Sequence, residues 1–202
     1  LHTGIHSFPT RRSSDPAAAV AFYAEARSLR EAIARTSPDM AGLQLALYES
    51  ELRDGESAWG QGRKAEAVGL FEQALARVRR IAAAEPDNSY RQREVSLVLT
   101  RLVPTYEAID RLDASIDAAI EAAGIAQRML AADPGNEAMR AGVTASAGWA
   151  ARQLLRANRL DEAAPFVATE MKVAQARLAV APENIDVQAT VALAHRRVFV
   201  TG

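Results

Sequence analysis

A proline recurs every 48 residues along this chain, at Pro38, Pro86, Pro134 and Pro182. Self-similarity with a period of roughly 20 to 50 residues is typical of repeat architectures, in which one supersecondary unit stacks on the next. The middle of each unit also aligns, since "GRKAEA" at 62–67 falls on "DRLDAS" at 110–115 and on "NRLDEA" at 158–163. Each of these is a polar turn before an apolar-periodic stretch, so the period predicts two helices per unit.

The second helix of each unit is expected at 63–84, 111–132 and 159–180. Residues 16–37 match the same helix of a preceding unit, with Tyr23 at the position of Phe71. Alanine supplies 44 of the 202 residues, which fits close-packed helices because alanine loses no side-chain entropy in a helix. The sequence therefore predicts an all-α array over 16–202, with full units at 38–85, 86–133 and 134–181 and half units at 16–37 and 182–202.

The junction between units carries a stop signal and a start signal. A proline excludes the residue before it from the α region, which ends one helix. An asparagine that can cap the next helix follows two residues later, at Asn88, Asn136 and Asn184. In the first unit Met40 stands at this position, so Asp39 is expected to be the cap there.

An apolar stripe marks the first helix of each unit. Its most regular position holds Leu47, Val95, Val143 and Val191, and in the second unit the stripe continues at Leu99, Leu102, Val103 and Tyr106. In the first unit Glu51 and Asp54 replace Leu99 and Leu102, so that helix is expected to shift, to pair these acids or to lie at a partly exposed end. Pro104 lies inside a predicted helix and predicts a bend.

The first 15 residues, "LHTGIHSFPTRRSSD", have neither a helical period nor the apolar core of a signal peptide. Residues 6–15 resemble the translation of a common sequencing adapter. We therefore expect 1–15 to be a non-native, disordered segment and the chain to be a fragment of a larger protein. The alternative is a natural basic arm, in which "TRR" at 10–12 contacts a partner.

Composition argues against several classes of function. A formal net charge of −1 gives no electrostatic attraction to phosphate backbones, so we expect no nucleic-acid partner. The apolar runs fall far short of the roughly 20 residues that span a bilayer, so we expect no membrane segment. Without cysteine the chain can form no disulfide and no zinc–thiolate site. The expected location is cytoplasmic.

The sequence offers no group of residues that suits catalysis. His195 is the one histidine outside the first 15 residues, and it stands where Leu99 and Ala147 lie in earlier units. We expect it to be packed on the core face or exposed at the end of the array, rather than a metal ligand or a general base. The acids and bases of "DRLD" at 110–113 and "RLDEA" at 159–163 are interpreted as solvated turns. We therefore predict no catalytic residue, no metal and no cofactor.

The repeat resembles the tetratricopeptide repeat, whose usual length is about 34 residues. The resemblance rests on a Gly or Asn at the inter-helix turn, then a small residue, an aromatic residue, another small residue and a final proline. The first small residue is Ala19, Ala67, Ser115 and Ala163; the aromatic position holds Tyr23, Phe71, Ala119 and Val167; the next small position holds Ala26, Ala74, Ala122 and Glu170. The small residue of the first helix is Gly55, replaced later by Val103 and Ala151. The family implies a right-handed α-solenoid of antiparallel helix pairs.

Stacked helix pairs create an extended surface that binds other proteins without special chemistry. The resemblance therefore implies a protein–protein interaction scaffold with a protein or peptide ligand. An alternative is a regulatory or localising region of a bacterial serine/threonine protein kinase, because long arrays with motifs such as "AADPGN" at 131–136 resemble those that follow such kinase domains. No kinase motif occurs in the chain itself. A third possibility is homo-oligomerisation through exposed ends of the array.

In the family, the concave groove is lined mainly by first helices, and carrying over its groove positions gives three residues per unit. They are Leu52, Glu56 and Trp59 in the first unit, Thr100, Pro104 and Glu107 in the second, and Gly148, Arg152 and Leu155 in the third. They lack the lysines and asparagines with which some members clamp a C-terminal carboxylate, so we do not expect that ligand. Trp59 and Arg152 are the expected anchors, because Trp and Arg dominate interface energetics. The alternative for Trp59 is that it only covers the turn at "GQG".

Overall fold

The computed structural model describes the backbone of residues 16–36, 40–86 and 88–201 and the side chains of most residues from 25 to 198. Within these ranges the chain forms eight helices: α1 (Pro16–Thr36), α2 (Ala41–Gly60), α3 (Lys64–Ala84), α4 (Ser89–Glu107), α5 (Leu112–Ala132), α6 (Glu137–Arg156), α7 (Leu160–Val180) and α8 (Ile185–Thr201). The segment 1–15, Pro38 and Asp39 lie outside the described residues, so the predictions for them stay predictions.

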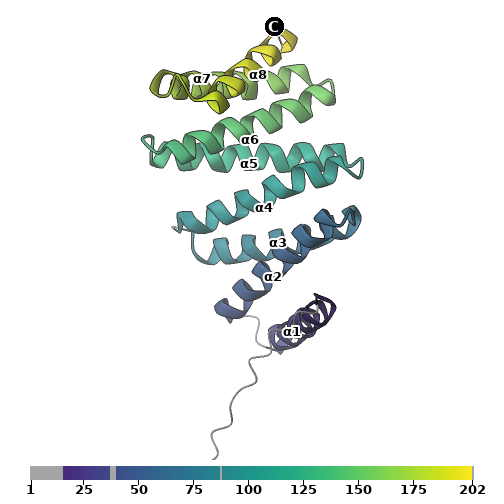
Figure 1. Ribbon diagram of the computed structural model, residues 1–202. Coiled ribbons are helices and arrows are strands. Elements are labelled where there is room, and N and C mark those ends of the chain that lie inside the picture. The colour runs from purple at the N-terminus through teal and green to yellow at the C-terminus, as the bar shows by residue number, and fades with distance from the viewer. Residues whose placement is uncertain (1–15, 37–39, 87, 202) are drawn as a thin grey trace, which may run out of the picture. The chain divides into compact units, whose positions relative to one another are not determined.

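The chain divides into two compact units, one ending at Leu47 and the other beginning at Tyr48. The first contains α1 and the start of α2, and the second contains the rest of α2 and α3 to α8. In the second unit each helix from α3 to α8 packs antiparallel to the next, and the helices lie one above another in chain order (Figure 1). α6 also contacts α8, the corresponding helix of the next repeat. The predicted all-α array of helix pairs is confirmed for this unit.

The turns between the two helices of a repeat share one backbone conformation. Residues at one repeat position have a positive φ, which is 76° at Gly62, 58° at Asp110 and 57° at Asn158. Glycine, asparagine and aspartate are the residues that tolerate this left-handed region. The amide of the following arginine donates at 2.9 Å to the carbonyl five residues earlier, which closes the preceding helix. The second helices therefore begin within one residue of their predicted starts.

Each described junction between repeats is a proline turn. The residues before the prolines, Glu85, Asp133 and Ala181, leave the helical region with ψ values of 63°, 79° and 68°. The amides of the three capping asparagines donate to the carbonyls of these same residues at 3.0, 3.2 and 3.1 Å, so each proline occupies the second position of a four-residue turn. The side chains of Asn88, Asn136 and Asn184 accept from amides in the first turn of the next helix, as predicted.

Packing between α2 and α3 explains why the aromatic position of the repeat holds smaller residues later in the chain. A Cβ at Gly55 would lie 2.6 Å from Cε1 of Phe71, so glycine leaves room for this buried ring. The equivalent pair one repeat later is Val103 and Ala119, and all of these residues are buried. The third repeat has Ala151 and Val167, also buried. A smaller residue in the second helix thus accompanies a larger one in the first.

The acid that interrupts the apolar stripe of α2 is paired. Glu51 is 1% exposed, and its carboxylate accepts from Nε of Arg77 in α3 at 2.9 Å and from Nη2 at 2.6 Å. Of the three outcomes expected for this helix, pairing is the one observed at Glu51. The equivalent positions one repeat later hold Leu99 and Ile125, both buried. A buried ion pair therefore stands where the next repeat has two apolar residues.

Candidate functional site

Two neighbouring cavities lie on the side of the second unit that is built from the first helices of the repeats. One, the α4–α6 pocket, has a volume of about 520 Å³. The other, the α6–α8 pocket, has a volume of about 280 Å³. Ala145 of α6 lines both, so the cavities adjoin at this residue. The surface formed by the pocket-lining residues of α4, α6 and α8 is called the first-helix face below.

The α4–α6 pocket is mainly apolar. Tyr90 and Leu97 of α4 line it and are 56% and 38% exposed. Met129 of α5 and Met139 of α6 complete the large apolar lining, while the charged lining is one arginine and one glutamate. Methionine side chains adapt to differently shaped partners because they are unbranched and flexible. This cavity therefore suits an apolar side chain of a ligand.

The α6–α8 pocket is rich in arginine. Its charged lining consists of Arg152 from α6, Glu170 and Arg177 from α7, and Arg197 from α8. The lining residues of α6 recur at spacings of three and four from position 141 to 152, which places them on one face of that helix. Two threonines and the ring of Trp149 contribute the rest of the polar and aromatic surface. The chemistry of this cavity differs from that of its apolar neighbour.

Glu170 is the buried acid of the α6–α8 pocket. It is 3% exposed and forms an ion pair with Arg197. Burial raises the pKa of the Glu170 carboxyl above its ordinary value, and the neighbouring Arg197 acts in the opposite direction. The second oxygen, Oε2, is buried without a hydrogen-bond partner among the described residues. The same repeat position holds Ala74 and Ala122 earlier in the chain, so only this described repeat carries a carboxyl there.

Gly148 of α6 makes the space that Glu170 occupies. A Cβ at Gly148 would lie 2.6 Å from Oε1 of Glu170 and 3.2 Å from Nη1 of Arg197. The equivalent residues in earlier repeats are Leu52 and Thr100, which are larger. Gly148, Glu170 and Arg197 therefore form one set of mutually adjusted residues drawn from three helices.

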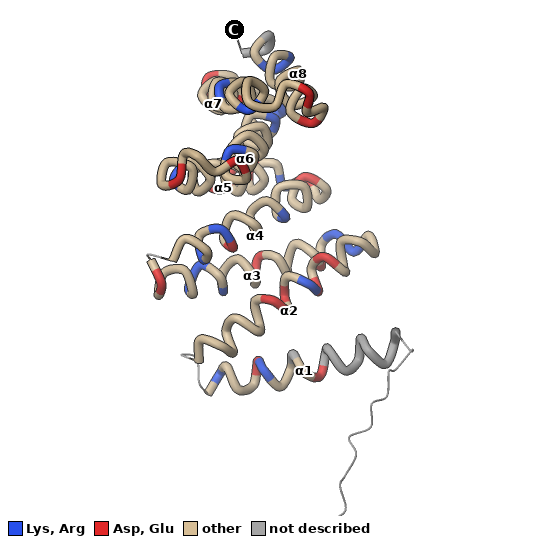
Figure 2. Tube along the Cα trace, turned by 60° about the vertical axis from the view of Figure 1, so that its left-hand side comes forward, with Lys and Arg blue, Asp and Glu red and all other residues tan. Residues whose placement is uncertain are grey.

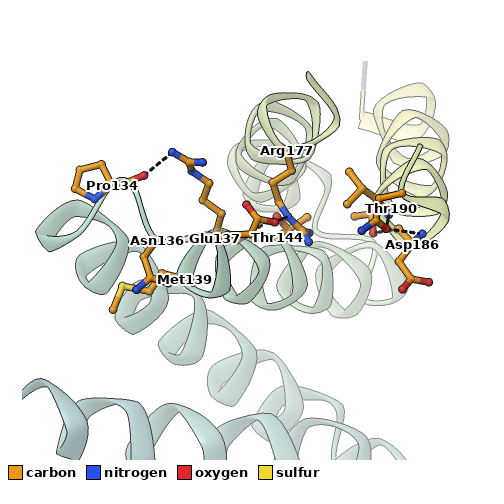
Figure 3. A network of polar contacts seen from close by, with 11 residues as sticks. Pro134, Asn136, Glu137, Met139, Thr144, Arg177, Asp186 and Thr190 are labelled. Atoms are coloured by element: carbon orange, nitrogen blue, oxygen red, sulfur yellow. Dashed lines mark hydrogen bonds and ion pairs between the residues drawn. The ribbon is translucent and has the colours of Figure 1, made fainter. Parts of the chain in front are cut away.

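Carboxylates that do not line the pocket hold its other two arginines. Nε of Arg177 donates to Glu137 of α6 at 2.7 Å (Figure 3). Arg152 pairs with Glu107 of α4, and its guanidinium lies 4.2 Å from the centroid of the Trp149 ring. These contacts fix the positions of both guanidinium groups. Each guanidinium has five N–H donors, more than one carboxylate can take.

The structure brings together only part of the predicted groove. Thr100 lines the α4–α6 pocket, while Gly148 and Arg152 line the α6–α8 pocket. Glu107 contacts Arg152, and Glu56 accepts from Nε of Arg101 at 3.1 Å. The other predicted groove residues line neither cavity: Leu52, Trp59, Pro104 and Leu155.

Two of these four residues carried further predictions. Trp59 is 38% exposed in the last turn of α2, so both interpretations of its role remain predictions. Pro104 lies inside α4, which continues to Glu107, and the predicted bend there stays a prediction.

Several pocket residues were absent from the predicted set, among them Tyr90, Leu97, Arg177 and Arg197. The positions carried over from the family lie on one stripe of α2, α4 and α6, so they include no residue of α7 or α8. One signal was present in the sequence. Glu170 departs from the small residue expected at its position, and a charged residue at a packed position indicates a local change of chemistry.

Charges of both signs are interspersed along the second unit, without a large patch of one sign in this view (Figure 2). Among the described residues no three His, Cys, Asp or Glu side chains are grouped as a metal site needs. His195 is exposed on α8, one of the two positions expected for it. None of the described helices combines the length and the apolar composition that a bilayer-spanning segment needs.

No protein-family model matches the chain, and no curated protein matches it. The tetratricopeptide resemblance therefore stays a prediction from the sequence. The two adjoining pockets are features of this chain's own geometry.

Proposed function

We propose that this chain is a protein–protein interaction scaffold of the tetratricopeptide type, a right-handed α-solenoid in which a segment of a partner protein lies along the first-helix face. The observation that carries the proposal is the adjacency of two pockets on successive first helices, which meet at Ala145. A polypeptide presents side chains at regular short intervals, so it can fill adjoining pockets with successive residues.

The different chemistry of the two pockets supports a polypeptide ligand. The α4–α6 pocket offers exposed apolar groups, including Tyr90 and Leu97, whose burial against a partner is favourable by about 25 cal/mol per Å². The α6–α8 pocket offers guanidinium groups and a tryptophan, which are residue types enriched at binding hot spots. An apolar contact beside a polar one gives both affinity and direction to a bound segment.

Selection of peptides tests this function. Random peptides displayed on phage are selected on the immobilised protein, and the affinities of the enriched peptides are then measured with purified variants. Ala145→Trp places a large side chain where both pockets meet. Ala76→Trp places the same side chain at an exposed position of α3 outside both pockets, and serves as the matched control.

We expect the enriched peptides to bind the original chain and Ala76→Trp equally, and to bind Ala145→Trp at least about tenfold more weakly, a loss of about 1.4 kcal/mol. Circular dichroism checks that both variants keep their helical content. Failure to enrich any peptide, or equal binding by both tryptophan variants, would contradict a binding site on the first-helix face.

A further inference from the structure

We propose that the α6–α8 pocket recognises a carboxylate side chain, aspartate or glutamate, of the bound partner segment. This inference rests on the proposed function and specifies the partner's chemistry at one of its two pockets. It is carried by the charge balance of the pocket, by the rigid placement of its arginines and by the unpaired oxygen of Glu170.

The charge balance favours an anionic group. Three guanidinium groups and one carboxyl line the cavity. The acids outside its lining that pair with the lining arginines are Glu107, which accepts from Arg152 and Arg156, and Glu137, which accepts from Arg177. Counting these acids together with Arg156 leaves the positive groups in excess, four against three. This excess of positive charge would repel a cationic side chain and attract a carboxylate.

The arginines are held in place before a ligand arrives. The side chains of Arg177 and Arg197 are only 15% and 19% exposed. Arg152 is held between Glu107 and the ring of Trp149. Long arginine side chains lose rotamer freedom when they bind a ligand, and prior placement reduces that cost. Arginine also binds carboxylates through two parallel N–H donors, which gives the contact a defined geometry.

The carboxyl of Glu170 adds a further group that fits an acid. Its Oε1 is occupied by Arg197, and its Oε2 is buried without a partner in the described chain. Burial favours the protonated form of this carboxyl, and in that form the group is a hydrogen-bond donor as well as an acceptor. Gly148 holds this arrangement open, since any Cβ there would collide with the Glu170 carboxyl. The repeats with alanine at this position have no such group.

Fluorescence of Trp149 provides a direct readout. Trp149 lines the pocket and is one of two tryptophans in the chain, so a Trp59→Phe background leaves it as the sole tryptophan. The probe is a hexaglutamate peptide that is acetylated at its N-terminus and amidated at its C-terminus, so that all of its carboxylates are side chains. A hexaglutamine peptide with the same ends is the neutral probe.

We expect hexaglutamate to change the Trp149 emission in a saturable way and hexaglutamine to leave it unchanged. Arg177→Gln in combination with Arg152→Gln should weaken hexaglutamate binding by at least about tenfold. Arg101→Gln is the matched control, because Arg101 also pairs with a glutamate of a neighbouring first helix but lines neither pocket. Hexaglutamate binding by Arg101→Gln should be weaker by less than about twofold, because salt screens the one charge that this variant removes outside the pockets.

Equal responses to the two peptides would overturn the inference, and so would an equal loss of binding in Arg101→Gln. The comparison of the two peptides needs no pocket variant, so it decides the question even where an arginine variant fails to fold. The two proposals also fail differently. Selected peptides that lose affinity in Ala145→Trp but show no enrichment of Asp or Glu would leave the scaffold function intact and remove only the acidic preference.

Discussion

Gly55 and Phe71 show how a single missing Cβ decides packing. Because a Cβ at Gly55 would lie 2.6 and 2.8 Å from two ring carbons of Phe71, it would displace the ring. We expect Gly55→Val to lower the free energy of unfolding by roughly 1–3 kcal/mol, because the core becomes overpacked. Phe71→Ala should lower it by roughly 3–5 kcal/mol, because a cavity is left. The double variant reproduces the Val103 and Ala119 pair of the next repeat, so it should cost clearly less than the two losses combined.

Urea unfolding of the four proteins measures this coupling. An interaction free energy of at least about 1 kcal/mol between the two substitutions is expected. Additive losses within about 0.5 kcal/mol would show that the two positions do not compensate each other.

Glu170 gives the free energy of unfolding a predictable dependence on pH. The folded state raises the pKa of this acid above its ordinary value, so its contribution to stability is complete below that value and is lost as pH rises through the folded-state pKa. The other charged side chains that line this pocket are Arg152, Arg177 and Arg197. Glu170→Gln keeps an oxygen that can accept from Arg197 and removes the titration.

We therefore expect the stability of Glu170→Gln relative to the original chain to increase as pH is raised from 4.5 to 8. Urea unfolding of both proteins across this range measures the difference. A difference that stays constant, or that turns against the glutamine variant at high pH, would show that the paired, ionised carboxylate is the favoured folded form.

At the scale of the helix pair, the ion pair between α2 and α3 invites replacement by the residues of the next repeat. Glu51→Leu and Arg77→Ile together would install the pair that α4 and α5 have in Leu99 and Ile125. Replacing a buried ion pair with apolar residues of similar size is often neutral or stabilising by about 1–4 kcal/mol. Arg77→Ile alone would leave the buried Glu51 carboxylate without this partner, at a cost of about 3–5 kcal/mol.

Thermal and urea unfolding of the two variants check this expectation. We expect the double variant to be at least as stable as the original chain. Arg77→Ile alone should be clearly less stable than the original chain. If both variants lose stability equally, the ion pair would be shown to stabilise α2 and α3 by more than its desolvation costs.

The helices were predictable from the sequence because their signals are local. Pro134 and Asn136 lie two residues apart and act on the turn and on the helix that contain them. Asn158 likewise specifies a turn by its own backbone tolerance. The arginines that pair with Glu51 and Glu170 lie 26 and 27 residues away along the chain. The local sequence pattern therefore does not tell with which side chain each acid pairs.

The pockets were predictable only in part for a related reason. Repeat register tells which helices are neighbours, and three of the residues it selected, Thr100, Gly148 and Arg152, line the cavities. It does not tell which side chains meet across α6, α7 and α8, because that depends on the individual residues rather than on the period. Arg177 and Arg197 therefore emerged only from the structure.

At the scale of the whole molecule, the common period predicts that one repeat can be removed. Deleting 86–133 joins Glu85 to Pro134 and recreates the proline turn that the chain has at each described junction. We expect the shortened chain to stay helical and to unfold cooperatively, because each repeat of an array contacts mainly its neighbours. Its urea m-value should fall, since m scales with the surface exposed on unfolding.

A deletion of 86–125 is the control, since it removes a similar length but breaks the period. Circular dichroism and urea unfolding of both deletions should show a folded protein only for the in-register one. A folded out-of-register chain, or loss of structure in both, would contradict the equivalence of the repeats.

The sharing of Ala145 by both pockets has a consequence for affinity. A segment anchored in one pocket would present its next residues to the other at an effective concentration on the order of millimolar, because the tether between the two contacts is short. Two contacts that are each weak would then combine into a complex far tighter than either. Such bivalent binding would reject ligands that carry only one of the two anchors, and would release its ligand in steps through half-bound states.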